Sequence, residues 1–161
     1  MLKSASYILI VIAGFFIIAC GTAKTATGDN FQKNDFAGDW TITDIQADVP
    51  EGYRISNIFD EASYKDFQSS KWMLDRNGFG NYTLKDGKTQ QIYWSLYKHD
   101  STAMFQFKKI EAGEKPKNID DGYRLQINNK INNSFILQMP VPVNNAAGGH
   151  LRLTFTKLTT S

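Results

Sequence analysis

Few residues in this sequence could do chemistry. The 161-residue chain has one cysteine, Cys20, and two histidines, His99 and His150. One thiol can form neither an intramolecular disulfide nor a cysteine-based metal cluster, and the histidines lack the spacing of metal ligands. Asp100 follows His99, but a His–Asp pair needs a nucleophile, and no serine or cysteine can be assigned to it. We therefore expect no catalytic residues, no metal and no cofactor.

Composition excludes two further classes of protein. Lys and Arg total 18 against 16 Asp and Glu, which gives a formal net charge of +2. That balance is unlike the polybasic surface of a nucleic-acid-binding protein. Aromatic residues make up 13% of the chain, which is too many for a disordered protein. The length favours one domain.

Cys20 stands at the end of an apolar run. Residues 7–19 are apolar or small, and Lys3 precedes them. The run is shorter than the roughly 20 residues that span a bilayer as a helix. A charged start, a short apolar segment and small residues at its end are typical of a secretory signal peptide. A buried core helix or an uncleaved anchor is the alternative. We interpret residues 1–19 as a signal peptide.

The sequence Ile17-Ile18-Ala19-Cys20 resembles the lipobox of bacterial lipoproteins. The resemblance implies cleavage before Cys20 and attachment of long acyl chains such as palmitate, so that the partner of this residue is a membrane. Two or three such chains hold a protein at a membrane far better than one. Gly21, rather than an aspartate, follows the cysteine, which by the same resemblance favours the outer membrane of a Gram-negative bacterium. We expect a lipidated tether over residues 20–35 and a globular domain over residues 36–161.

Apolar and polar residues alternate with period two through most of the globular region, as in half-buried strands. Eight such runs occur, at residues 38–43, 71–75, 81–85, 91–97, 103–109, 123–128, 135–141 and 151–156. Asn77-Gly78 and Asp86-Gly87 are hairpin signals. Short strands with turn signals between them favour a barrel or a sandwich. We predict an all-β fold, an eight-stranded antiparallel up-and-down barrel, which also leaves no strand edge exposed.

One long stretch, residues 47–70, lacks strand alternation. A structureless loop of that length is uncommon in a compact domain. Ile55, Ile58, Phe59 and Ala62 recur at helical spacing, and Ser56 could cap such a helix. We therefore expect a short helix or a folded lid between the first two strands.

Gly38-Asp39-Trp40 matches the G-x-W signature of lipocalins, and the later strands resemble the lipocalin-like domains of bacterial lipoproteins over about residues 36–158. The resemblance implies a barrel with a central cavity for a small apolar molecule. It also implies that Trp40 packs across the closed end against a basic residue of the last strand. Alternation directs Lys157 inward and Arg152 outward, so Lys157 is the expected partner.

Large side chains that face inward are the candidate ligand-binding residues. They are Trp72, Tyr82, Trp94, Phe105, Phe107, Tyr123 and Phe135. Such rings could line a cavity that binds a small hydrophobic molecule. Alternatively, they fill a barrel of this size by packing against each other. The protein would then be a non-catalytic envelope module that docks a protein or glycan, for which Tyr93 and Tyr97 on the outer face are candidates. The sequence identifies no protein partner.

Overall fold

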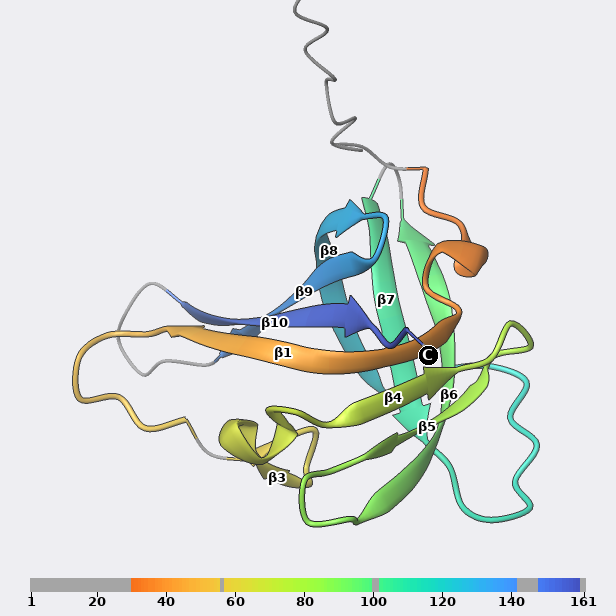
Figure 1. The fold of residues 1–161 in the computed structure, drawn as a ribbon, viewed down its shortest axis with the longest axis horizontal. Coiled ribbons are helices and arrows are strands. Elements are labelled where there is room, and N and C mark those ends of the chain that lie inside the picture. The colour runs from red at the N-terminus through yellow and green to blue at the C-terminus, as the bar shows by residue number, and fades with distance from the viewer. Residues whose placement is uncertain (1–29, 56, 100–101, 142–147, 160–161) are drawn as a thin grey trace, which may run out of the picture.

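The chain folds into a closed barrel of eight antiparallel strands (Figure 1). The structure, a computed structural model, describes residues 30–55, 57–99, 102–141 and 148–159, so Cys20 and the predicted signal peptide lie outside the described residues. The barrel strands are β1 (Gly38–Asp48), β4 (Lys71–Leu74), β5 (Phe79–Thr83), β6 (Thr89–His99), β7 (Thr102–Lys109), β8 (Tyr123–Ile131), β9 (Ser134–Val141) and β10 (Gly149–Lys157). Each strand pairs with its neighbour in the chain, and β1 pairs with both β10 and β4, which closes the barrel. The predicted fold class is confirmed.

Alternation along each strand decides which side chains face the interior. In β4, Trp72 and Leu74 are buried, whereas Lys71 and Met73 are exposed. The same alternation holds through β5 and along β10 as far as Phe155. Successive strand residues point to opposite faces, so the apolar set of every strand meets in one core inside the barrel.

Both glycine-containing turns lie where the sequence predicts them. Gly78 ends the β4–β5 turn with φ 101°, and Gly87 ends the β5–β6 turn with φ 90°. Asn77 and Asp86 have negative φ and instead accept a hydrogen bond from the backbone N–H two residues on, at 2.9 Å in each turn. Only the glycine of each pair is left-handed, as in hairpin loops that end on a residue with positive φ.

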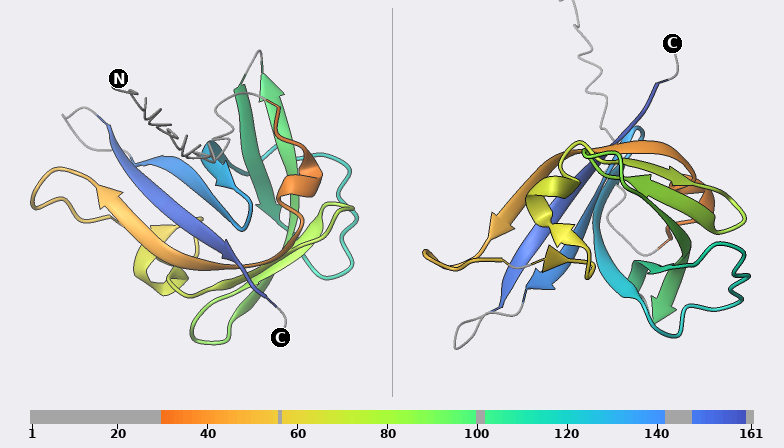
Figure 2. Two further views of the ribbon diagram at one scale, coloured as in Figure 1. Left: turned by 45° about the horizontal axis from the view of Figure 1, so that its top comes forward. Right: turned by 90° about the horizontal axis from the view of Figure 1, so that it is seen from below.

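The connections gather at two ends because neighbouring strands run antiparallel. The β1–β4 connection, the β5–β6 turn and the β7–β8 loop meet at one end, which we call the mouth. The β4–β5 and β8–β9 turns lie at the other, the closed end, together with residues 30–37. Figure 2 shows the β1–β4 connection and residues 30–37 against opposite parts of the barrel.

The β1–β4 connection is not the helix that the apolar spacing predicts. Its residues form a two-stranded hairpin of β2 (Asn57–Ile58) and β3 (Ala62–Ser63), followed by the 3₁₀-helix η2 (Tyr64–Phe67). Ser63 caps η2, whereas Ser56, the predicted cap, lies outside the described residues. Of the two predicted alternatives, a short helix or a folded lid, the connection is a folded lid. The apolar spacing does not produce a helix over residues 57–62 because Ile58 and Phe59 insert into the core from the hairpin. We call residues 57–67 the lid.

Residues before Phe36 belong to the folded domain. Phe31 is buried in the core, and η1 (Lys33–Asp35) leads into Phe36, which is fully buried. Phe31 and Phe36 meet edge to face with ring centroids 5.8 Å apart. Residues 31–35, which we assigned to the tether, therefore pack on the barrel.

Candidate functional site

The closed end brings together the three residues of the predicted lipocalin signature. Trp40 donates its indole N–H to the Phe36 carbonyl oxygen at 2.8 Å. Lys157 is the cross-strand partner of Trp40, and its ammonium nitrogen lies 5.7 Å from the centroid of the Trp40 ring. Gly38 adopts φ 133°, a conformation that a side chain disfavours. This arrangement closes one end of the barrel.

The seven candidate wall residues all face the interior, but they contact other rings. Six of them are fully buried, and Tyr123 is partly exposed at the mouth. Ring contacts run without a break from the closed end to the mouth. The successive pairs are Phe31–Phe36, Phe36–Phe135, Phe135–Phe155, Phe155–Trp72 and Trp72–Phe59. The core is therefore a column of aromatic side chains.

Phe59 of the lid occupies the mouth. Its ring centroid lies 5.0 Å from that of Phe107, 5.1 Å from Tyr123 and 5.2 Å from Phe67. The Trp72 ring lies 6.4 Å away. Phe59 is only 3% exposed. The position expected for a small apolar ligand is thus occupied by a side chain of the protein itself.

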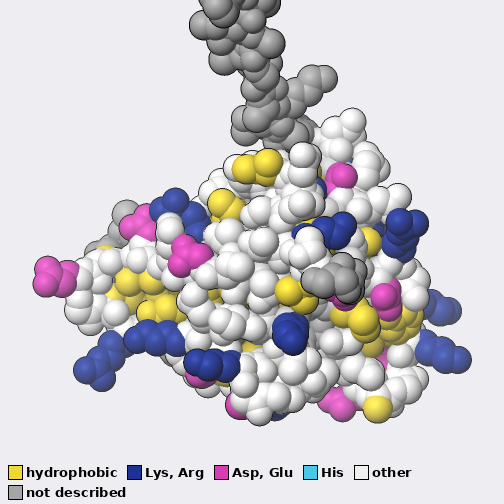
Figure 3. Space-filling view, viewed as in Figure 1, with side chains coloured by type: hydrophobic (Ala, Val, Ile, Leu, Met, Phe, Trp, Pro, Cys, Tyr) yellow, Lys and Arg dark blue, Asp and Glu magenta, His cyan; other side chains and the backbone are white. Residues whose placement is uncertain are grey.

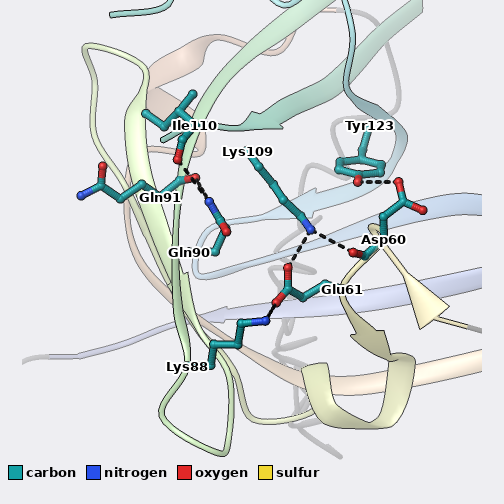
Figure 4. Close-up of polar contacts among 8 residues, drawn as sticks. All are labelled: Asp60, Glu61, Lys88, Gln90, Gln91, Lys109, Ile110 and Tyr123. Atoms are coloured by element: carbon teal, nitrogen blue, oxygen red, sulfur yellow. Dashed lines mark hydrogen bonds and ion pairs between the residues drawn. The ribbon is translucent and has the colours of Figure 1, made fainter. Parts of the chain in front are cut away.

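Charged groups fasten the lid to the barrel (Figure 4). Glu61 accepts a hydrogen bond from the Lys109 ammonium group at 2.6 Å and forms an ion pair with Lys88. Lys109 also donates to the Asp60 carbonyl oxygen at 3.2 Å. Tyr123 donates its hydroxyl to the Asp60 carboxylate at 2.9 Å. The Glu61 side chain is 6% exposed, so this carboxylate is held almost entirely by two lysines.

These contacts change the proton affinities at the mouth. Hydrogen bonds from Lys109 and Lys88 lower the pKa of Glu61, against the opposing effect of burial. Burial raises the pKa of Tyr82 well above its usual range, and burial with the Asp60 hydrogen bond raises that of Tyr123. The Tyr82 hydroxyl lies beside the Glu61 carboxylate without a well-aligned hydrogen bond. Glu61 is therefore an anion at neutral pH, and both tyrosines are neutral.

A groove of about 510 Å³ opens to solvent beside the lid. It is lined by Asp60, Lys108, Lys109, Asp120, Asp121, Gly122 and Tyr123. Lys108 pairs with Glu114 at 3.2 Å, whereas Lys109 faces the lid. The groove therefore opens beside Tyr123, whose ring contacts Phe59, and beside the lysine that holds Glu61.

Sequence reasoning missed the polar residues of the mouth. Asp60, Glu61, Lys88 and Lys109 show no motif, because an ion pair between distant residues leaves no local pattern. One signal could have placed Lys88: it directly follows the predicted Asp86-Gly87 turn. The backbone of His99 ends β6, and Asp100 lies outside the described residues.

Comparisons with protein-family models, curated proteins and solved structures give no match for this chain. The architecture alone defines the class, an all-β protein with a closed eight-stranded barrel. Among the described residues, no three His, Cys, Asp or Glu side chains are placed to hold a metal ion. In the same part of the chain, no helix is long and apolar enough to cross a membrane.

Proposed function

We propose that this protein is a lipid-anchored lipoprotein of the cell envelope whose barrel binds a small hydrophobic molecule at the mouth. The observation that carries the binding proposal is the position of Phe59, whose ring is enclosed by aromatic wall residues at an end of the barrel. A site that takes a phenyl ring from the lid can take one from solution. The anchor rests on the lipobox ending at Cys20 and on its resemblance to bacterial lipoproteins.

Binding requires the lid to move, and its backbone favours movement. Phe59 and Asp60 have φ values of 54° and 47°, in the left-handed region. Such residues cost of order 1–3 kcal/mol each, with the larger cost at the bulky phenylalanine. The strain lowers the free energy needed to open the lid. An apolar ligand that then fills the mouth regains about 25 cal/mol for each Å² of apolar surface that it buries.

Tryptophan fluorescence tests the binding proposal. Trp72 contacts Phe59, whereas Trp94 lies under Lys33 towards the closed end. Titration with apolar molecules of graded size should give a saturable change in emission. A Trp94→Phe variant should keep that change and a Trp72→Phe variant should lose most of it. The absence of any response to the whole panel would contradict the binding proposal.

The anchor needs a separate test. In cells, Cys20→Ser should prevent acylation and release the protein from the membrane fraction. Incorporation of labelled palmitate into the unaltered chain, and its loss in the variant, gives the matched measurement. Membrane association that persists in the variant would contradict a lipid anchor at this residue.

The filled interior favours a second candidate, an interaction module that holds no ligand. Its outer face would then carry the function. The large hydrophobic residues exposed on the described surface are Met73, Ile131 and Leu158. Figure 3 shows hydrophobic side chains on one face in separate small patches within a polar surface. Tyr93 packs on Phe79, and Arg124 lies over the Tyr97 ring, so both candidate tyrosines have neighbours in their own sheet. Cross-linking in intact cells that captures one specific partner, together with no ligand response, would favour this second function.

A further inference from the structure

The lid presents a ring and a carboxylate to the barrel as a bound ligand would. We infer that the ligand of the mouth is a small aromatic monocarboxylate, whose ring replaces Phe59 and whose carboxylate replaces that of Glu61 on Lys109 and Lys88. This inference rests on the proposed binding function and specifies its ligand class.

The ring position is built for an aromatic group. Phe59 meets Phe67, Phe107 and Tyr123 edge to face, with interplanar angles of 83°, 72° and 67°. Aromatic rings prefer this arrangement because the positive edge of one ring meets the negative face of another. A phenyl group from solution would regain these contacts, whereas an aliphatic chain would regain only the burial of apolar surface.

The carboxylate position is an anion site. Lys109 and Lys88 both converge on Glu61, and hydrogen bonds between ionised groups are about twice as strong as neutral ones. Removal of Glu61 from the mouth leaves the Lys109 ammonium group, which is partly buried, without its carboxylate. An incoming carboxylate restores that pair, and an uncharged analogue does not.

Two features limit the size and charge of the ligand. Below Phe59 the interior is occupied by Trp72, which contacts both Phe107 and Phe155, so a long acyl chain cannot enter without repacking the core. Asp120 and Asp121 line the groove outside and disfavour a second negative charge. The ligand is therefore short and carries one carboxylate.

The probe for this inference is 4-phenylbutyrate, and its uncharged amide is the matched control. Calorimetric titration should be made on the full-length Cys20→Ser chain and on the same chain with Phe59→Ala and Glu61→Gln. The double variant vacates both positions occupied by the lid, so it should bind 4-phenylbutyrate about tenfold or more tightly than the chain with an unaltered lid. It should prefer the acid to the amide by about tenfold, and addition of Lys109→Met should lower that preference, because only Lys88 then remains at the carboxylate position.

A second variant keeps the test decisive if the double variant does not fold, as judged by circular dichroism. Glu61→Gln alone frees the lysines and loosens the lid, so it should raise affinity for 4-phenylbutyrate more than affinity for the amide. Equal binding of acid and amide would overturn the inference while leaving the proposed apolar site intact. No binding of either compound, or of any apolar probe, to any variant would overturn both. Tighter binding of palmitate than of 4-phenylbutyrate would also overturn the ligand class inferred here.

Discussion

Glu61 accepts a 2.6 Å hydrogen bond from Lys109, a residue 48 positions away in the chain. Lys88 approaches the same carboxylate from the β5–β6 turn. The end of β7, the β5–β6 turn and the lid thus meet at one buried carboxylate. Phe59 and Glu61 lie on the same tight turn, so this contact and the ring contacts of Phe59 hold the same segment on the barrel.

The Glu61 carboxylate should make stability depend on pH. Its pKa in the folded protein is below the ordinary value of 4.5. The contribution is therefore present above about pH 4.5 and is lost as the pH falls through the folded pKa, because the unfolded chain then binds the proton more readily. Urea midpoints between pH 3 and 7 should show this loss in the unaltered protein and a smaller one in Glu61→Gln. Equal pH dependence in both would contradict the ion-pair arrangement.

Truncation of Phe59 should destabilise the barrel. Phe59→Ala removes a buried ring, and such changes cost about 3–5 kcal/mol when the neighbours cannot collapse into the space. Equilibrium unfolding in urea measures the change. Met73→Ala is the matched control, since Met73 is 41% exposed and should cost far less. A cost for Phe59→Ala as small as that of the control would mean that the ring does not pack as described.

The Lys157 ammonium group at the closed end should contribute modestly to the stability of the folded protein. Lys157→Met removes the charge over the Trp40 ring but keeps most of the apolar stem, so we expect a loss of about 0.5–1 kcal/mol and a change in Trp40 emission. Lys157→Arg should retain both the stability and the Trp40 emission of the unaltered protein. Arg152→Met is the control, because Arg152 lies outside the barrel near Asp48 and should leave the tryptophan emission unchanged. Equal effects of the two methionine substitutions would contradict a specific role for Lys157.

Gly80 allows β4 and β5 to approach each other. A Cβ atom at Gly80 would lie 2.3 Å from the Met73 carbonyl oxygen, so Gly80→Ala must push the two strands apart. We expect Gly80→Ala to lower the free energy of unfolding by about 2 kcal/mol or more. Gly87→Ala is the comparison: it meets no neighbour within 4 Å, and only its φ of 90° disfavours a side chain. Thermal unfolding should rank Gly80→Ala as the more damaging, and the reverse order would contradict the described pairing.

The barrel could be predicted from the sequence because period-two alternation is a local signal. Trp72 and Leu74 in one strand, and Leu151, Leu153 and Phe155 in another, show which face is buried before any pairing is known. The lid could not be predicted in the same way. Ile58, Phe59 and Ala62 have helical spacing, but their burial depends on insertion between strands that lie far away in the sequence. Tertiary packing overrode the local pattern there.

The candidate site was half predictable. Its apolar wall follows from strand alternation, which placed Trp72, Phe107 and Tyr123 inside the barrel. Its charged half does not, because Lys109 is simply the last residue of a strand and Glu61 belongs to a turn. The ring of Phe59 in the mouth was also beyond reach, since whether side chains fill a barrel depends on volumes in three dimensions.

Hydrogen exchange of the lid tests the central claim most directly. The claim is that a ligand takes the place of Phe59, so the β2–β3 hairpin, residues 57–63, must leave the mouth when the site is filled, whereas Phe67 stays to contact the ligand ring. Exchange measured by mass spectrometry, with and without saturating 4-phenylbutyrate, should become faster in residues 57–63 and slower in β4 and β7. Equal or slower exchange throughout the lid at saturation would show that Phe59 stays in place and would contradict the account.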